Sequence, residues 1–206
     1  SYSNLGQHSK AIKDYTKYLN NNSNDFKSHF YCGVSYYELK EFNKAEIYFK
    51  KAISIKSDFS KAFWQLGALY EKQGNLTDAL DNFNEAIKFD SLNVEYYFKR
   101  AIFKSYKLND NSSALVDIAK VVQLDNNYKK EIVLTQYITL LIQEKRIKTA
   151  NDISNELIKA NINNPLGYYF KGFTNILLGN DGCNDLKKAY DLGFEKAEKY
   201  IIENCE

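Results

Sequence analysis

The side chains best suited to covalent or metal chemistry in this chain are three cysteines and two histidines. Cys183 lies about ten residues before a turn predicted at Gly193 and Phe194, and Cys205 lies about eleven residues after it. If the flanking segments are antiparallel helices, the two thiols meet at the open end of the hairpin. A disulfide across this separation of 22 residues (205 minus 183) would stabilise the folded chain by roughly 3 kcal/mol. The alternative is two unpaired thiols, one at a helix start and one at the chain end.

The remaining candidates for chemistry have a structural interpretation. Cys32 falls on a face expected to be buried, where a thiol acts as a small core hydrophobe. His8 and His29 have no Cys, Asp or Glu partner at the spacing of a metal site. The chain also contains no glycine-rich phosphate loop, no Ser/His/Asp arrangement and no nucleophile elbow. We therefore expect no metal, no cofactor and no enzymatic activity.

Small and aromatic residues recur with a period of 34 residues in the N-terminal half of the chain. The recurring sets are Ala11, Ala45 and Ala79; Gly33 and Gly67; Tyr36 and Tyr70; Phe49 and Phe83; and Ala52 and Ala86. Small residues let two helix backbones approach closely, while the aromatic residues fill the space beside them. A period of this length predicts helical pairs that bury their apolar faces only by stacking on their neighbours.

When the repeats are numbered from Phe26 and Ser60, these residues fall at positions 8, 11, 20, 24 and 27. The pattern resembles the tetratricopeptide repeat. The resemblance implies an all-α fold, a right-handed superhelical solenoid of antiparallel helix pairs, acting as a non-catalytic scaffold for protein or peptide partners. The stretch from Cys183 to Gly193, with the last cysteine, is similar to the ending of exported bacterial members, which favours an exported over a cytoplasmic protein.

The resemblance extends over the chain as about five and a half repeats in a single domain. The predicted parts of domain 1–206 are a half repeat at 1–24, repeats at 26–59, 60–93, 94–128, 131–163 and 165–193, and a capping helix at 195–205. The step from Ala79 to Ala114 is 35 residues, which predicts one inserted residue between Leu108 and Ser113. Because the chain starts at Ser1 with the second half of a repeat, we expect a longer protein upstream.

Charge and hydropathy exclude some classes of partner. The 28 basic and 26 acidic residues give a net charge of +2, which disfavours nucleic-acid binding driven by phosphate contacts. No run of 18 apolar residues occurs, so no membrane span is expected.

In members of this family the inner wall is formed by positions 2, 5, 9, 12 and 13 of the first helices. The residues that the resemblance assigns to partner binding are Phe30, Val34, Tyr37, Trp64, Ala68, Glu71, Phe98, Ile102, Tyr169 and Phe173, with a rim of mixed charge at Lys27, Lys61, Lys72 and Glu38. Members that clamp a terminal carboxylate have Lys, Arg or Asn at positions 5 and 9, and this chain has none there. We therefore predict an aromatic ladder that binds an apolar peptide.

Three alternatives remain open at this point. In the first, the aromatic residues at position 5 of each repeat only pack against adjacent helices. The chain would self-associate through its repeat edges as a homo-oligomer, or it would be the regulatory segment of a larger protein.

Overall fold

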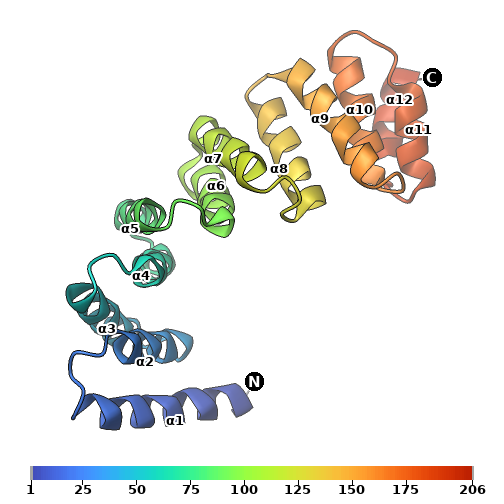
Figure 1. Ribbon diagram of the computed structural model, residues 1–206. Coiled ribbons are helices and arrows are strands. Elements are labelled where there is room, and N and C mark those ends of the chain that lie inside the picture. The colour runs from blue at the N-terminus through green and yellow to red at the C-terminus, as the bar shows by residue number, and fades with distance from the viewer. Residues whose placement is uncertain (1, 206) are drawn as a thin grey trace. The chain divides into compact units, whose positions relative to one another are not determined.

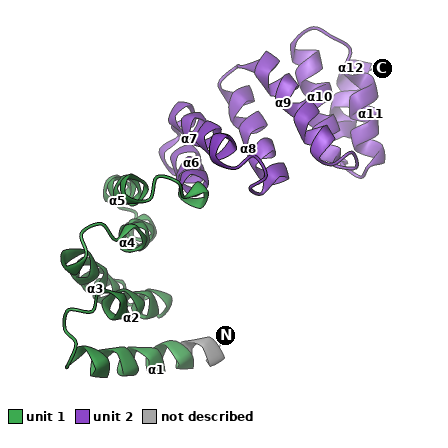
Figure 2. Ribbon diagram, in the orientation of Figure 1, with its two compact units in different colours: residues 1–96 green, residues 97–206 purple. Residues whose placement is uncertain are grey.

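The computed structural model describes the backbone of residues 2–205 and the side chains of residues 6–205, and within that part every regular element is a helix (Figure 1). The chain divides into two compact units, residues 1–96 and residues 97–206 (Figure 2). The helices of unit 1 are α1 (Tyr2–Leu19), α2 (Phe26–Glu38), α3 (Phe42–Ile55), α4 (Ser60–Gln73) and α5 (Leu76–Phe89). The next helix, α6 (Val94–Leu108), begins with the last residues of unit 1. Unit 2 continues with α7 (Asn111–Leu124), α8 (Lys130–Gln143), α9 (Ile147–Ala160), α10 (Pro165–Leu177), α11 (Cys183–Asp191) and α12 (Ala197–Cys205).

Unit 1 contains two helix pairs, α2 with α3 and α4 with α5, that coincide with the most regular repeats of the sequence. The first helix of each pair ends in the same way. The amide of Glu41 donates to the carbonyl of Tyr36 and that of Asn75 to the carbonyl of Tyr70, both at 2.9 Å. The residue before each donor is left-handed, Gly74 with φ 80° and Lys40 with φ 61°. Glycine adopts this conformation at little cost, whereas Lys40 adopts it despite its Cβ.

The recurring small and aromatic residues form the core of unit 1. Ala45, Phe49 and Ala79 have no solvent exposure, and Phe83 is 2% exposed. A Cβ placed on Gly67 would lie 2.7 Å from two ring carbons of Phe83 and 3.0 Å from the carbonyl oxygen of Ala79. The prediction that small residues set the helix spacing is therefore confirmed.

We expect Gly67→Ala to lower the free energy of unfolding by about 1 to 2 kcal/mol. Overpacking costs about 1 to 3 kcal/mol, and the higher helix propensity of alanine offsets up to about 1 kcal/mol of that loss. Urea denaturation followed by circular dichroism measures this loss. The matched control is Gly6→Ala in α1, where nothing lies within 4 Å of the new Cβ, so stability should rise slightly. An equal gain at both positions would contradict the close packing at Gly67.

The extra residue of the fourth repeat lies at the end of α6. There the amide of Asp110 donates to the carbonyl of Lys104, six residues back, whereas the corresponding bonds of unit 1 reach back five residues. The left-handed residue Asn109, with φ 53°, then directly precedes Asp110, as Gly74 precedes Asn75. The insertion thus lies between Lys104 and Asn109, which overlaps the predicted interval of 108–113 at Leu108.

Local capping and turn residues account for the start of α10 and for the turn after α11. The Asn164 side chain accepts a hydrogen bond from the amide of Leu166 at 2.9 Å, and Pro165 occupies the first turn of α10, where its missing N–H has no helical partner to lose. After α11 the chain turns at Gly193, whose φ is 94°. The last helix starts at Ala197 rather than at residue 195, because residues 195–196 form a turn.

Two glycines bring α10 against the start of α11. A Cβ on Gly172 would lie 2.7 Å from the carbonyl oxygen of Gly182, and a Cβ on Gly182 would overlap the backbone of Gly172. No side chain fits between these backbones, so both positions require glycine.

Candidate functional site

Phe30, the first member of the predicted aromatic ladder, lies inside unit 1. It is 7% exposed, and its ring centroid lies 5.9 Å from that of Phe49 and 5.1 Å from that of Phe59. The structure therefore places this ring in the core, where a partner does not reach it.

Trp64 is half-buried against the helices that follow it. Its ring lies 4.4 Å from that of Phe83 and 4.5 Å from that of Tyr96, and the second pair is stacked with an interplanar angle of 5°. Aromatic pairs in these arrangements contribute about 0.5 to 1.5 kcal/mol beyond the burial of their area. Packing between repeats, one of the two interpretations of this position, therefore accounts for most of the indole surface.

The predicted ladder residues of unit 2 also have partners within their own unit. Phe98 meets Tyr128 edge to face at 6.0 Å, and Ile102 is half-buried. Tyr169 and Phe173 stack on each other at 6.0 Å, and rings near the chain end cover them. Those rings are Phe194, 4.7 Å from Tyr169, and Tyr200, 5.1 Å from Phe173. Burial and the hydrogen bond to Tyr200 raise the pKa of Tyr169.

The inner-wall positions on α2 and α4 leave a different surface, which we call the α2–α4 face. It consists of Lys27, Val34, Tyr37 and Glu38 on α2 and of Lys61, Ala68, Glu71 and Lys72 on α4. Counted from Val34 and from Ala68, the other residues lie three, four or seven positions away and so fall on one stripe of each helix. Lys27 and Lys61 stand at the helix starts and Glu38, Glu71 and Lys72 at the helix ends, with half-buried Val34 and Ala68 between them.

Tyr37 lies near the end of α2 and close to the end of α4, since its ring neighbour Phe42 and Gln73 of α4 line the same hollow. Burial raises the pKa of the Tyr37 hydroxyl, and the carboxylates of Glu38 and Glu71 raise it further. Because Glu38 is on α2 and Glu71 is on α4, both helices bring negative charge to the same phenol. The ring of Tyr37 also packs against that of Phe42, with centroids 5.7 Å apart.

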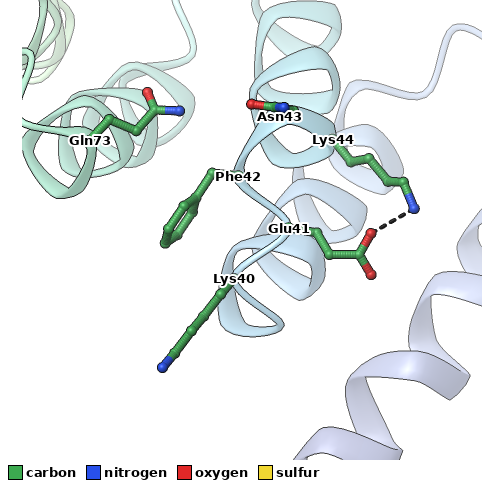
Figure 3. A pocket seen from close by; sticks show the side chains of 6 residues that line it. All are labelled: Lys40, Glu41, Phe42, Asn43, Lys44 and Gln73. Atoms are coloured by element: carbon green, nitrogen blue, oxygen red, sulfur yellow. Dashed lines mark ion pairs between the residues drawn. The ribbon is translucent and has the colours of Figure 1, made fainter.

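A shallow hollow adjoins this end of the face, at the turn between α2 and α3 (Figure 3). Its volume is about 410 Å³, and its lining residues are Lys40, Glu41, Phe42, Asn43, Lys44 and Gln73. Glu41 and Lys44 pair with each other at 2.6 Å, so their charges are already neutralised. The exposed side of Phe42 is therefore the main apolar surface that the hollow offers.

Comparison with known sequences accounts for the repeat pattern of unit 1. Residues 26–59 match one family profile described as tetratricopeptide repeat, and residues 1–25 and 60–91 match a second profile with the same description. Residues 1–91 belong to the tetratricopeptide repeat family. Among curated proteins, the chain is 32% identical over 92 residues to the BBSome complex member BBS4 of Mus musculus and 31% identical over 80 residues to the protein O-mannosyl-transferase TMTC3 of Homo sapiens. These matches cover 44% and 39% of this chain but only 17% and 9% of those proteins.

Solved tetratricopeptide-repeat structures share the fold over nearly the whole chain. YrrB, described as a protein of this family with an unusual peptide-binding site, superposes with a TM-score of 0.75 at 19% identity and covers 90% of this chain and 96% of its own. The C-terminal part of a repeat-containing protein from Cytophaga hutchinsonii reaches the same TM-score at 16% identity, covering 96% of this chain and 78% of its own. The all-α tetratricopeptide-repeat fold is therefore established for this chain.

One buried charged group in unit 2 was missed by sequence reasoning. Asp117 on α7 is 2% exposed and pairs with two cations of α6. Arg100 donates to its two carboxylate oxygens at 2.9 and 2.6 Å, and Lys104 lies 2.9 Å from one of them. Both cations are 13% exposed and stand 34 residues after Leu66 and Tyr70. The available signal was an acidic residue within the apolar stripe of α7, opposite two basic residues four apart on α6.

The cysteines differ sharply in their surroundings. The Sγ atoms of Cys183 and Cys205 lie 2.11 Å apart and their Cα atoms 5.7 Å apart, at the open end of the hairpin formed by α11 and α12. Cys32 is fully buried, and burial raises the pKa of its thiol to about 11. That thiol is therefore protonated at neutral pH and unreactive, since the thiolate is the nucleophile.

The described residues include no group of three or more His, Cys, Asp or Glu side chains placed to hold a metal ion. Among the described helices, none combines the length and the apolar character needed to cross a lipid bilayer.

Proposed function

We propose that this chain is a non-catalytic interaction module that binds a protein or peptide segment on the α2–α4 face. Tetratricopeptide-repeat proteins are in general scaffolds for protein partners, and the similarity to YrrB, which has a peptide-binding site, supports the same role here. The observation that carries the proposal is the half-buried strip of Val34 and Ala68 between two charged edges. A strip of this kind admits a partner backbone close to the helices, and the edges orient it.

The proposed surface is narrower than the ladder predicted from the sequence. Phe30 is excluded because it is buried, and Trp64 contributes only the part of its ring that its two aromatic neighbours leave free. A partner role for Phe98, Ile102, Tyr169 and Phe173 stays a prediction, since each lies half-buried within unit 2.

The test is the substitution Ala68→Arg, which fills the strip with a long charged side chain. We expect it to weaken partner binding at least tenfold, since the partner backbone loses its contact with the helices. Partners are captured from the native extract, identified by mass spectrometry, and their affinities are then measured with purified components. Ala119→Arg on α7 is the matched control, because Ala119 is an exposed alanine of unit 2, and it should leave affinity unchanged. Equal affinities for both variants would refute the proposal.

A further inference from the structure

Four of the five charges of the α2–α4 face are placed against the dipoles of their own helices. Lys27 and Lys61 are the second residues of α2 and α4, at the positive helix ends, and Glu38 and Glu71 lie in the last turns, at the negative ends. Each such placement costs roughly 0.3 to 1 kcal/mol. Helix α5 in the same unit has the stabilising arrangement, with Asp78 in its first turn and Lys88 in its last. Lys72, also in the last turn of α4, has the stabilising placement. The placement of Lys27, Lys61, Glu38 and Glu71 is therefore not explained by helix stability.

These reversed charges are also uncommitted in the part of the chain that the structure describes. Lys61, Glu38 and Glu71 have no ion pair there. Lys27 lies 6.0 Å from the ring of Phe26 and attracts the carboxylate of Asp25 without forming a direct ion pair. Lys72, next to Glu71, likewise has no acidic partner among the described residues.

The acidic residues near the lysine edge have other partners. Asp25 caps α2 by accepting a bond from the amide of Ser28 at 3.0 Å, and Asp58 pairs with Lys56 at 2.6 Å. The lysine edge is thus free to attract an anionic group, and the phenol between two carboxylates is free to attract a cationic one. Because the helix dipoles have the same sign as the side chains at each edge, both act on a partner in the same direction.

The separation of the two edges sets the spacing of the partner's charges. Lys27 and Tyr37 are ten residues apart on α2, as are Lys61 and Glu71 on α4. At a rise of 1.5 Å per residue this separation is about 15 Å, which an extended segment spans with about four to five residues.

From these observations we propose that the α2–α4 face binds an extended segment with an acidic and a basic residue four to five positions apart. The acidic residue lies at the lysine edge and the basic residue beside Tyr37, between Glu38 and Glu71, where the aromatic ring adds a cation–π contact. Small apolar residues between them contact Val34 and Ala68. The inference rests on the proposed function and specifies the chemistry of its partner.

The probes are capped synthetic peptides of alanine and valine with one Asp and one Lys, in both orders, separated by one to eight positions. Binding to the full chain is measured by isothermal titration calorimetry. We expect the highest affinity at a separation of four to five, weakening as salt rises. Glu38→Gln with Glu71→Gln should reduce that affinity at least tenfold. Affinity that is independent of separation, or no binding of any peptide, overturns the inference.

A charge-reversal variant tests the edges without relying on a loss of binding. Lys27→Glu with Lys61→Glu makes both edges acidic, so this variant should reject the Asp–Lys peptides and bind Lys–Lys peptides of the same spacing. Lys51→Glu on α3, an exposed position away from the face, is the control and should keep the original preference. A reversal variant that keeps the Asp–Lys preference overturns the inference.

Failure of this inference is distinguishable from failure of the proposed function. If peptide spacing has no effect while Ala68→Arg still weakens binding of the captured partner, the charge pattern is wrong and the binding face stands. If Ala68→Arg also has no effect, both fail.

Discussion

Replacing Asp117 with Asn should lower the free energy of unfolding by about 3 to 5 kcal/mol, the loss typical of removing one partner from a buried ion pair. The amide has the shape of the carboxylate but no charge, so Arg100 and Lys104 would face each other across a site where each is 13% exposed. Two like charges would then remain in a region of low dielectric constant after the loss of the carboxylate that pairs with both. Urea denaturation followed by circular dichroism measures the loss.

The control for Asp117→Asn is Asp185→Asn, which removes a longer and more exposed ion pair. Asp185 lies 3.6 Å from Lys171, with the two side chains 21% and 33% exposed, so the loss should be at most about 1 kcal/mol. A rescue variant transplants Leu66, Tyr70 and Asn82 of repeat 60–93 into repeat 94–128 as R100L, K104Y and D117N. This variant should recover most of the stability, since apolar residues often replace buried ion groups without loss. Similar losses for Asp117→Asn and Asp185→Asn would show that the buried triad has no special role.

Replacing both Cys183 and Cys205 with Ser should lower the free energy of unfolding by about 3 kcal/mol under oxidising conditions. The bridge closes a separation of 22 residues, and a loop of this size restricts the unfolded chain by about that amount. The bridge also ties the end of α12 to the start of α11, on the side of the aromatic cluster of Tyr169, Phe173 and Tyr200. We expect the loss to appear in thermal denaturation and to match the effect of a reducing agent on the unmodified chain.

Thiol alkylation before reduction, followed by mass spectrometry, decides directly whether the bridge forms. We expect neither Cys183 nor Cys205 to react, and Cys32 to react only after denaturation because it is fully buried. The variant Cys32→Ala should keep the response to reducing agent. Alkylation of Cys183 and Cys205 in the folded, unreduced chain would show that they are free thiols.

The repeat architecture of unit 1 was predictable because each contact recurs at a fixed spacing. Gly33 packs on Phe49 as Gly67 packs on Phe83, so two copies of one interaction predict each other. The start of α10 was predictable for a local reason, since Asn164 and Pro165 satisfy a helix terminus without help from the rest of the chain. Self-association and the single-domain division are not tested and stay predictions.

The features that were not predicted depend on tertiary contacts, that is, on which of several possible neighbours a side chain packs against. Position 5 of the repeat predicts an aromatic ring but not whether it faces a partner, and the stacking of Trp64 on Tyr96 requires a residue 32 positions away (96 minus 64). The insertion near the end of α6 was predicted only as an interval, because a wider final turn has no signature in residue type. The Asp117 triad was missed because it departs from the periodic pattern of small and aromatic residues.

The stacking of Trp64 between Phe83 and Tyr96 has a practical consequence, since it is the only tryptophan of the chain and all three rings lie in unit 1. When Trp64 is excited selectively, its fluorescence therefore reports the unfolding of unit 1 alone. Far-ultraviolet circular dichroism, in contrast, sums the helices of both units. Coincident midpoints from the two signals would show that the units melt together, and separate midpoints would give each its own stability. The same indole neighbours Ala68 on α4, which makes it an intrinsic, label-free reporter for a ligand bound to the α2–α4 face.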